Sequence, residues 1–265
     1  MSAMPWYDPE DRSMPVINPP EQIRSKYPEM QIPVLPPRAV VFCLGHGLTV
    51  LKERYFCEQI MEKLPGFITH SEVLGVKDIP GVCFVHGGYG APQAVCTIET
   101  LHVLGVKEVI LAGLCGGFDE ELSVGDILLP GKILSEEGTS LHYRETSGFA
   151  EVSPPVTFDR MGSFFRDRGY RVWHKDTVTT DAIYRQTFRK EQTWRDMGCA
   201  AVDMEASALV NVCNLYGIRN MVVLMVSDRH PLSEDDPEWK WGCTNFPELR
   251  ERFIRDCIEF STEEK

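Results

Sequence analysis

The sequence is poor in basic residues relative to acidic ones. Lysine and arginine together number 27 against 39 aspartates and glutamates, which gives a formal net charge of -12 and an isoelectric point near 5.1. A chain with this balance has no cationic excess to attract phosphate backbones or anionic lipid. We therefore expect no nucleic-acid polymer among its partners.

Long apolar runs and paired cysteines are missing as well. No stretch approaches the roughly 20 apolar residues that cross a bilayer, and the N-terminus lacks the basic and apolar regions of a secretory signal. The nine cysteines contain no CxxC pair typical of zinc or redox sites. We expect no membrane partner, no metal, a cytoplasmic location, and reduced cysteines that pack as small hydrophobes. Cys115 is the candidate for a reactive thiol, because glycines surround it.

The proline distribution divides the chain into two parts. Residues 1–37 contain nine of the 18 prolines and show no helical or strand period, which predicts an extended N-terminal arm with little internal structure. Residues 38–265 show no second compositional break, so we expect one domain there.

Apolar β-rich runs alternate with amphipathic stretches throughout residues 38–265. This order predicts an α/β fold with three layers, α/β/α, around a central mixed sheet. Strands are expected at residues 39–44, 82–86, 108–112, 126–129, 171–179, 200–203 and 220–226. Helices are expected at residues 51–63, 92–104, 163–168, 185–197, 205–216 and 247–260.

The first motif is a glycine-rich segment after the strand predicted at residues 108–112. Gly113, Gly116 and Gly117 should form a turn at the carboxyl end of that strand, where open α/β sheets place their ligands. The spacing matches neither a dinucleotide loop nor a Walker loop. A tight turn without a ligand explains the glycines equally well.

The second and third motifs place acidic residues at strand ends. In residues 201–209 (AVDMEASAL), a carboxylate beside the start of a helix should stay ionised and accept hydrogen bonds from the hydroxyls of a sugar. The alternative is that Asp203 and Glu205 cap the helix. The apolar strand at residues 220–226 ends in Ser227 and Asp228. Burial there should raise the proton affinity of Asp228 and suit it to act as a general acid, the alternative being a loop cap.

Together with residues 86–90 (HGGYG) and 136–143 (EEGTSLHY), these segments resemble the nucleoside phosphorylase superfamily, which includes purine nucleoside phosphorylase, uridine phosphorylase and adenosylhomocysteine-type nucleosidases. The resemblance covers roughly residues 38–228. It implies the three-layer fold, ribose binding by Met204 and Glu205, and protonation of a purine by Asp228. Residues 180–189 resemble the base-contacting stretch of uridine phosphorylases, which implies pyrimidine recognition by Gln186 and Arg189. The identity of the base therefore stays open.

The chain departs from that family at its phosphate site. Leu111 and Leu114 stand where the family has an arginine and a serine or threonine, and residues 43–52 lack the family's second arginine. A phosphate site without guanidinium groups should bind weakly. The substitutes available are basic side chains and backbone N–H groups in the glycine-rich segments: Gly45, His46, Gly113 and Arg144, with Lys52 and Arg54 further candidates.

The resemblance favours a nucleoside phosphorylase that uses phosphate as co-substrate and no cofactor. Two alternatives remain: a nucleosidase of the same fold that uses water, and a non-catalytic member that serves as a binding or assembly subunit. Family pockets are completed by a neighbouring subunit, so a homo-oligomer, a dimer or a hexamer, is expected.

Overall fold

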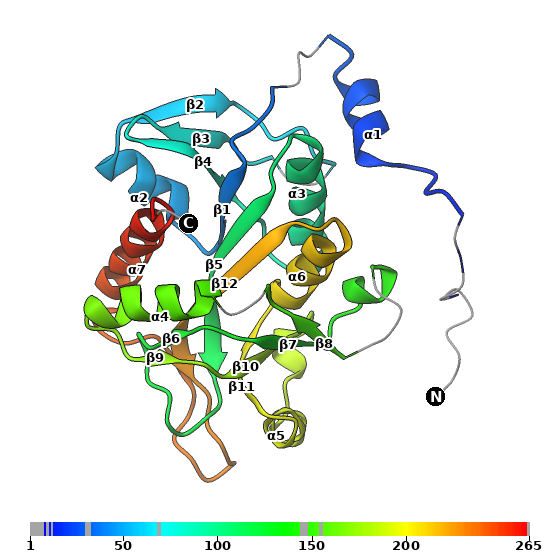
Figure 1. The fold of residues 1–265 in the computed structure, drawn as a ribbon. Helices are drawn as coiled ribbons and strands as arrows, with labels where there is room; N and C mark the ends of the chain where they lie inside the picture. The colour runs from blue at the N-terminus through cyan, green and yellow to red at the C-terminus, as the bar shows by residue number, and fades with distance from the viewer. Residues whose placement is uncertain are drawn as a thin grey trace.

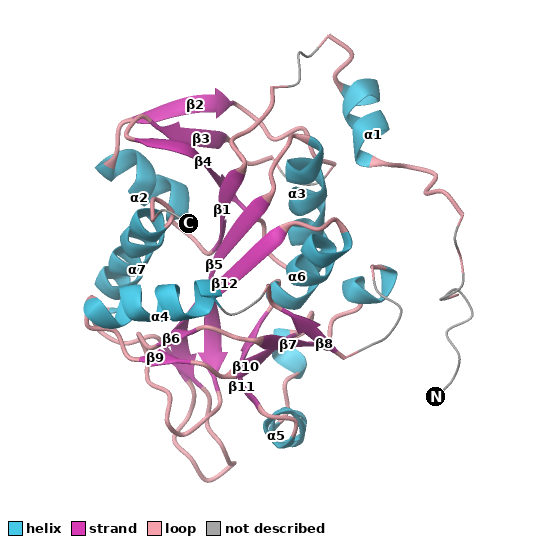
Figure 2. Cartoon of the chain, viewed as in Figure 1, coloured by secondary structure: helices cyan, strands magenta, loops and turns pink. Residues whose placement is uncertain are grey.

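A central mixed β-sheet lies between two layers of helices in the computed structural model, which describes residues 8, 11, 13–29, 33–67, 70–143, 148–153 and 156–263 (Figure 1). One face of the sheet carries α2 (Gly47–Arg54), α4 (Val156–Asp167) and α7 (Phe246–Phe260), and the other carries α3 (Ala91–Val103) and α6 (Ala206–Leu215) (Figure 2). Outside these layers lie α1 (Pro19–Lys26), α5 (Phe188–Asp196) and two 3-10 turns, η1 (Thr139–His142) and η2 (Ile183–Arg185). The predicted three-layer α/β fold is confirmed.

Four parallel strands form the centre of the sheet. They are β4 (Ile79–His86), β1 (Arg38–Cys43), β5 (Glu108–Gly117) and β12 (Arg219–Arg229), in that spatial order. Their side chains are buried on both faces, as expected for parallel strands covered by helices. In β1 the side chains alternate: Ala39 and Val41 join the core beneath α3 and α6, while Val40 and Phe42 join the core beneath α2, α4 and α7.

Shorter strands extend the centre and make the sheet mixed. Beyond β4 lie the antiparallel β3 (Val73–Val76) and β2 (Cys57–Met61). Beyond the end of β1, the same edge of β5 pairs with β11 (Cys199–Asp203), and the sheet continues through β10 (Asp176–Thr179), β7 (Lys132–Ser135) and β8 (Phe149–Glu151). The short strands β6 (Ile127–Leu128) and β13 (Lys240–Trp241) pair with β12, and β9 (Val172–Trp173) pairs with β6.

Several sequence-based predictions of local structure were wrong. Residues 51–63 do not form one helix: α2 ends at Arg54, and β2 follows because pairing with β3 outweighs the helical spacing. The strand expected at residues 171–179 is divided into β9 and β10. The glycine-rich segment is no turn either, since β5 continues to Gly117 with ladder partners at Gly116 and Gly117.

The N-terminal arm contains a helix, contrary to the expectation of little internal structure. Asn18 Oδ1 accepts a hydrogen bond from the N–H of Glu21 at 3.0 Å, and prolines occupy the first positions of α1, where no N–H is needed. Ile23 is buried, and α1 packs against α3. The arm is therefore partly docked on its own domain.

Candidate active site

The candidate site lies where β5 changes neighbours. β1 pairs with β5 up to Gly113, and on the same edge β11 pairs with it at Gly116. Such a change of neighbour at the carboxyl end of a strand is where open α/β sheets bind ligands. Across β5, Asp228 also pairs with Gly116. Val202 and Asp228 are thus about 10 Å apart, two strand spacings, on either side of one glycine.

Asp203 and Glu205 follow β11 but have different roles. Asp203 Oδ2 accepts hydrogen bonds from the N–H groups of Ala206 at 2.7 Å and Glu205 at 3.3 Å, and Asp203 Oδ1 accepts from Thr179 Oγ1 at 2.5 Å. Asp203 therefore caps α6. The side chain of Glu205 makes no capping bond; its Oε1 accepts from the N–H of Gly90 at 2.7 Å. Capping does not explain Glu205, and this residue joins β11 to the loop after β4.

The buried carboxyl pair does not stay fully ionised, contrary to the sequence-based expectation. Burial raises the pKa of Glu205, and the nearby charge of Asp203 raises it further, to about 8. Burial also raises the pKa of Asp203, but three hydrogen bonds oppose the increase. One proton therefore resides on Glu205 in the free protein at neutral pH, and Met204, half-buried, lies between the two acids.

Asp228 is surrounded by hydrogen-bond donors. Ser227 Oγ donates to Asp228 Oδ1 at 2.5 Å, and Trp239 Nε1 donates to Oδ2 at 2.7 Å. The Nε2 atom of His230 lies 3.3 Å from the same Oδ2, and its Nδ1 lies 2.7 Å from Glu191 Oε1 on α5. Asp228 is thus a buried carboxylate with several donors, and the loop-cap alternative does not describe it.

The expectation that burial raises the proton affinity of Asp228 was wrong. Burial alone would raise its pKa, but hydrogen bonds from His230, Ser227 and Trp239 hold the pKa of Asp228 below its usual range. Donors that bind the charged form outweigh desolvation here. Asp228 is therefore ionised in the free protein at neutral pH.

Two glycine-containing loops form the opposite wall of the site. The loop after β4 has positive φ angles at Gly88 and Gly90, which only glycine adopts without strain. Its Tyr89 hydroxyl lies 3.6 Å from the position that a Cβ atom on Gly45 would occupy, so the loop after β1 lies against it. His46, also at positive φ, is exposed and begins α2.

The expected cationic substitutes for the phosphate arginines are mostly engaged elsewhere. Lys52 forms an ion pair with Glu72, and Arg54 pairs with Glu251. Leu111 is fully buried in the core, and Arg144 lies outside the described residues. Gly113 is held inside β5, between Cys43 and Leu224 on the neighbouring strands. Binding of phosphate by Gly45, His46 and Gly113 remains a prediction.

Arg250 on α7 is a cation that the sequence-based expectations missed. Its guanidinium lies 5.9 Å from the ring centroid of Phe246. Burial raises the pKa of Tyr89, the charge of Glu205 adds to the increase, and the charge of Arg250 opposes it. Arg250 is therefore within electrostatic reach of the Tyr89 hydroxyl. No local sequence pattern connects Arg250 with this site, because α7 lies far along the chain from Tyr89.

The expected base-contacting residues lie just before α5 and in its first turn. Gln186 is half-buried just after η2, and Arg189 is exposed on the first turn of α5. In the part of the chain that the structure describes, no hydrogen bond joins either side chain to Asp228 or Glu205. Base recognition by Gln186 and Arg189 remains a prediction.

Residues 136–143 contribute buried polar side chains to a hydrogen-bond network next to the site. Glu137 Oε1 accepts from Ser207 Oγ at 2.8 Å, and Oε2 accepts from the N–H of Ser140 at 2.9 Å. Ser207 lies on α6, and its N–H donates to Thr179 Oγ1 at 2.9 Å. This buried network links the segment to the Asp203 cap. Among the described residues, no cluster of histidine, cysteine or acidic side chains could hold a metal ion.

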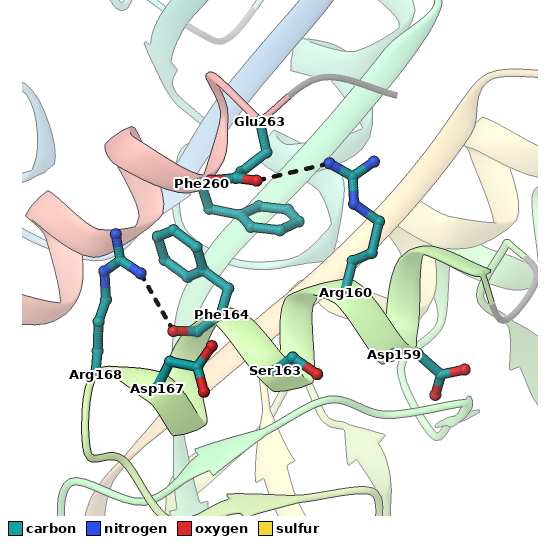
Figure 3. A pocket seen from close by; sticks show the side chains of 8 residues that line it. All are labelled: Asp159, Arg160, Ser163, Phe164, Asp167, Arg168, Phe260 and Glu263. Atoms are coloured by element: carbon teal, nitrogen blue, oxygen red, sulfur yellow. Dashed lines mark hydrogen bonds and ion pairs between the residues drawn. The ribbon is translucent and has the colours of Figure 1, made fainter.

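A cavity of about 420 Å³ lies elsewhere, between α4 and α7 (Figure 3). Arg160 approaches Glu263 at 3.7 Å across it, and the Arg168 guanidinium stacks 3.5 Å from the ring centroid of Phe164. None of the motif residues lines this cavity. We therefore place the chemistry at β5, where the motif residues lie, rather than here. No helix among the described residues is long and apolar enough to span a bilayer.

Comparison with known proteins gives consistent matches. A model of the phosphorylase superfamily matches residues 39–259. A DeoD-type purine nucleoside phosphorylase from an Exiguobacterium species is 25% identical over 209 residues, 75% of this chain and 85% of that protein. The structure of purine nucleoside phosphorylase from Toxoplasma gondii with immucillin-H has a TM-score of 0.71 at 19% identity, covering 86% of this chain and 91% of its own. AMP nucleosidase from Bacteroides thetaiotaomicron has a TM-score of 0.68 at 22% identity, covering 91% and 96%. These structures share the fold described above.

Proposed function

Since the chain belongs to the phosphorylase superfamily, we propose that it cleaves the N-glycosidic bond of a ribonucleoside, with phosphate as acceptor, to give free base and ribose 1-phosphate. The resemblance inferred from the motifs is confirmed, and the relatives are phosphorylases and nucleosidases. The observation that carries the proposal is the placement of Asp228 and of β11, the strand that leads to Glu205, on opposite sides of Gly116, with Glu205 free of any capping role.

The geometry assigns ribose binding and departure of the base to two different sides of the site. Glu205, beside Met204, faces the loop of Gly90 and is suited to bind the ribose hydroxyls, because its protonated form both donates and accepts. As the bond at C1′ lengthens, the sugar becomes cationic and favours the ionised form of Glu205, whose negative charge stabilises the sugar. Asp228, across β5, faces the departing base, which leaves more readily when one of its nitrogens gains a proton. Phosphate would approach from the side of Gly45, His46 and Arg250.

Hydrolysis is the second candidate, and one observation favours it. The positions of the family's phosphate-binding residues hold Leu111 and Leu114, and the pairing of Lys52 with Glu72 and of Arg54 with Glu251 leaves neither side chain as an obvious substitute. A site with so few free cations holds a phosphate dianion weakly, and water would then be the acceptor. Arg250 is the feature that keeps phosphate as the first candidate.

A panel of purine and pyrimidine ribonucleosides, incubated with the pure protein with and without phosphate, tests the proposal. Free base is measured by chromatography, and ribose 1-phosphate is distinguished from ribose by its charge. Base release that requires phosphate supports phosphorolysis, whereas release without phosphate supports hydrolysis. Release of base in neither condition contradicts both and leaves the binding or assembly role. An Asp228→Asn preparation, purified in parallel, controls for contaminating host enzymes.

We assign this activity to the cytoplasm, because all nine cysteines are free thiols, and free thiols are typical of a reducing compartment. Cys115 is not a reactive thiol in this setting. It is buried, and burial raises its pKa well above the usual range, with the charges of Asp203 and Asp228 adding to the increase.

A further inference from the structure

His230 is fixed in the wall of the site by three elements. Its Nδ1 contacts Glu191 of α5 at 2.7 Å, and its Nε2 contacts Asp228 Oδ2 at 3.3 Å. The ring packs on β5: a Cβ atom on Gly116 would lie 2.3 Å from Nε2, and the ring centroid of Phe118 is 6.4 Å away. Only 15% of the His230 side chain is exposed. Glycine at position 116 is thus required for the ring to reach Asp228.

The position of His230 between two carboxylates keeps it protonated. Burial alone would lower the pKa of His230, but the hydrogen bonds and charges of Asp228 and Glu191 outweigh it and raise the pKa to about 9. The charged groups that face the ring are therefore Glu191 from α5 and Asp228 from β12, while β5 contributes Gly116 and Phe118 follows β5 directly. Arg195 of α5 donates to the backbone carbonyl of Phe118 at 3.4 Å.

This arrangement raises a question about the proposed reaction. A departing base needs a proton, but Asp228 is an ionised carboxylate in the free protein and has none to give. A second group must supply that proton to it. His230 is a protonated group in hydrogen-bond contact with the Asp228 carboxylate, whereas Ser227 and Trp239 are much weaker acids.

We propose that His230 is a positioning residue for the reaction, which stores a proton between Glu191 and Asp228 and delivers it to the leaving base through the Asp228 carboxyl group. The inference rests on the proposed function, since it assigns the origin of the proton in that cleavage. Trp239 is 51% exposed and donates its indole N–H to Asp228 Oδ2, so the position of this N–H is the one that the accepting nitrogen of the base takes.

The step balances without any additional reactant. The C1′–N electron pair moves to the base, a proton passes from His230 Nε2 to Asp228 and from Asp228 to a base nitrogen, and an oxygen of the acceptor bonds to C1′. The acceptor, monohydrogen phosphate or water, releases one proton as it bonds. That proton restores the imidazolium, so the cycle consumes none overall. Glu191 keeps Nδ1 protonated throughout and compensates the charge.

A substrate that needs no proton separates proton delivery from all other roles of the site. The leaving group of 4-nitrophenyl β-D-ribofuranoside departs as a stable anion. For His230→Gln we expect turnover of the best nucleoside from the panel to fall by about 10²-fold or more, the usual contribution of general acid catalysis, with turnover of the nitrophenyl riboside nearly unchanged. The activity of the wild-type protein on the nucleoside should also decline above about pH 9, and this alkaline limb should be absent from the variant.

Glu191→Gln provides a second variant that keeps the histidine. Loss of its charge should lower the pKa of His230, so the alkaline limb should move to lower pH while activity at pH 6 persists. Gln192→Ala, an exposed change on the same helix, is the matched control and should behave as wild type.

The outcomes are distinct. Equal losses on both substrates in His230→Gln, or an unmoved alkaline limb in Glu191→Gln, would mean that His230 only holds Asp228 in place and would overturn the inference. If the wild-type protein cleaves neither substrate, the proposed function itself fails, and the inference fails with it.

Discussion

Asp203 and Glu205 are two positions apart in the chain but have different functions in the site. Asp203 accepts the first N–H groups of α6, which leaves Glu205 to face the loop of Gly90. A buried acid without a capping role costs stability once it ionises, because its charge loses hydration and meets the charge of Asp203. At the residue scale, Glu205 is thus retained at a thermodynamic disadvantage, as is common for functional groups.

Glu205→Gln should separate stability from activity. Catalytic efficiency should fall by about 10²-fold or more, roughly 3 kcal/mol, because glutamine cannot ionise and so cannot supply a negative charge as the sugar becomes cationic. The folded protein holds a proton on Glu205 up to about pH 8, whereas the unfolded chain releases it near the ordinary value of 4.5. Stability of the wild type therefore decreases as pH rises through this window. The variant has no acid at this position and does not lose stability in this way. At pH 8.5 it should melt above the wild type, by roughly 2–4 °C for each kcal/mol of unfolding free energy that the wild type has lost.

Melting temperature and kcat/KM are measured on the same preparation, at pH 5 and pH 8.5. Near pH 5 the two proteins should melt alike, because Glu205 of the folded wild type is then protonated and uncharged, as the glutamine of the variant is. A lower melting temperature with normal turnover would instead indicate that the carboxyl group has a structural role.

His230 contributes stability with its own pH dependence. Its pKa is raised from the ordinary 6.5 to about 9 in the folded protein, so its contribution is complete below pH 6.5 and is lost as pH rises through 9. The difference in unfolding free energy between wild type and His230→Gln should therefore shrink by up to about 3 kcal/mol between pH 6 and pH 10. Urea unfolding at both pH values measures it. A difference that does not change with pH would show that His230 is not an imidazolium in the fold.

At the scale of elements, β5 carries the site because glycine lets other groups approach it. A methyl group on Gly116 would collide with the His230 ring, which is held in turn by Glu191 and Asp228. Gly116→Ala should therefore reproduce the kinetic defect of His230→Gln and destabilise the fold by about 1–3 kcal/mol, the range for overpacking. Gly131→Ala, where the nearest atom is 3.8 Å from the new Cβ, is the control. Normal nucleoside turnover in Gly116→Ala would contradict this role of the glycine.

The short helix α1 depends on its cap. Replacing Asn18 by alanine removes the acceptor for the N–H of Glu21 and should cost about 1 kcal/mol of helix stability. Trypsin should then cleave faster after Arg24 and Lys26, which lie in the last turn of α1. Gel analysis of timed digests measures the rate, and Ser13→Ala, ahead of the helix, is the control. Equal rates would show that packing of Ile23, rather than the cap, holds the helix.

At the scale of the whole molecule, the arm carries apolar surface that its own domain does not cover. Met14, Val16 and Ile17 are 83%, 96% and 65% exposed. Exposed apolar side chains near one another favour contact with another subunit. We expect a solution mass of at least twice 30.1 kDa at micromolar concentration, measured by light scattering after size exclusion. A monomeric mass would contradict this expectation, and a mass six times that of the chain would indicate a hexamer.

The sequence by itself determined the layers of the fold and the ends of the strands that carry acids. Continuous apolar runs mark the central strands, and abrupt polar residues such as Asp203 and Asp228 mark where a strand reaches the edge of the core. Those signals are local, and they predict the central strands correctly because a strand that is buried on both faces has few other possible arrangements. The same local signals failed at residues 51–63, where the partner strand β3 decides between helix and strand.

Only the tertiary structure decided which groups meet and which of them hold protons. Glu191 is 39 positions from His230, and Gly90 is 115 positions from Glu205, so no local pattern announces either contact. Proton affinity depends on burial and on the partners that packing supplies. That is why Asp228, expected to gain a proton by desolvation, is instead held ionised by its donors, while Glu205 retains one.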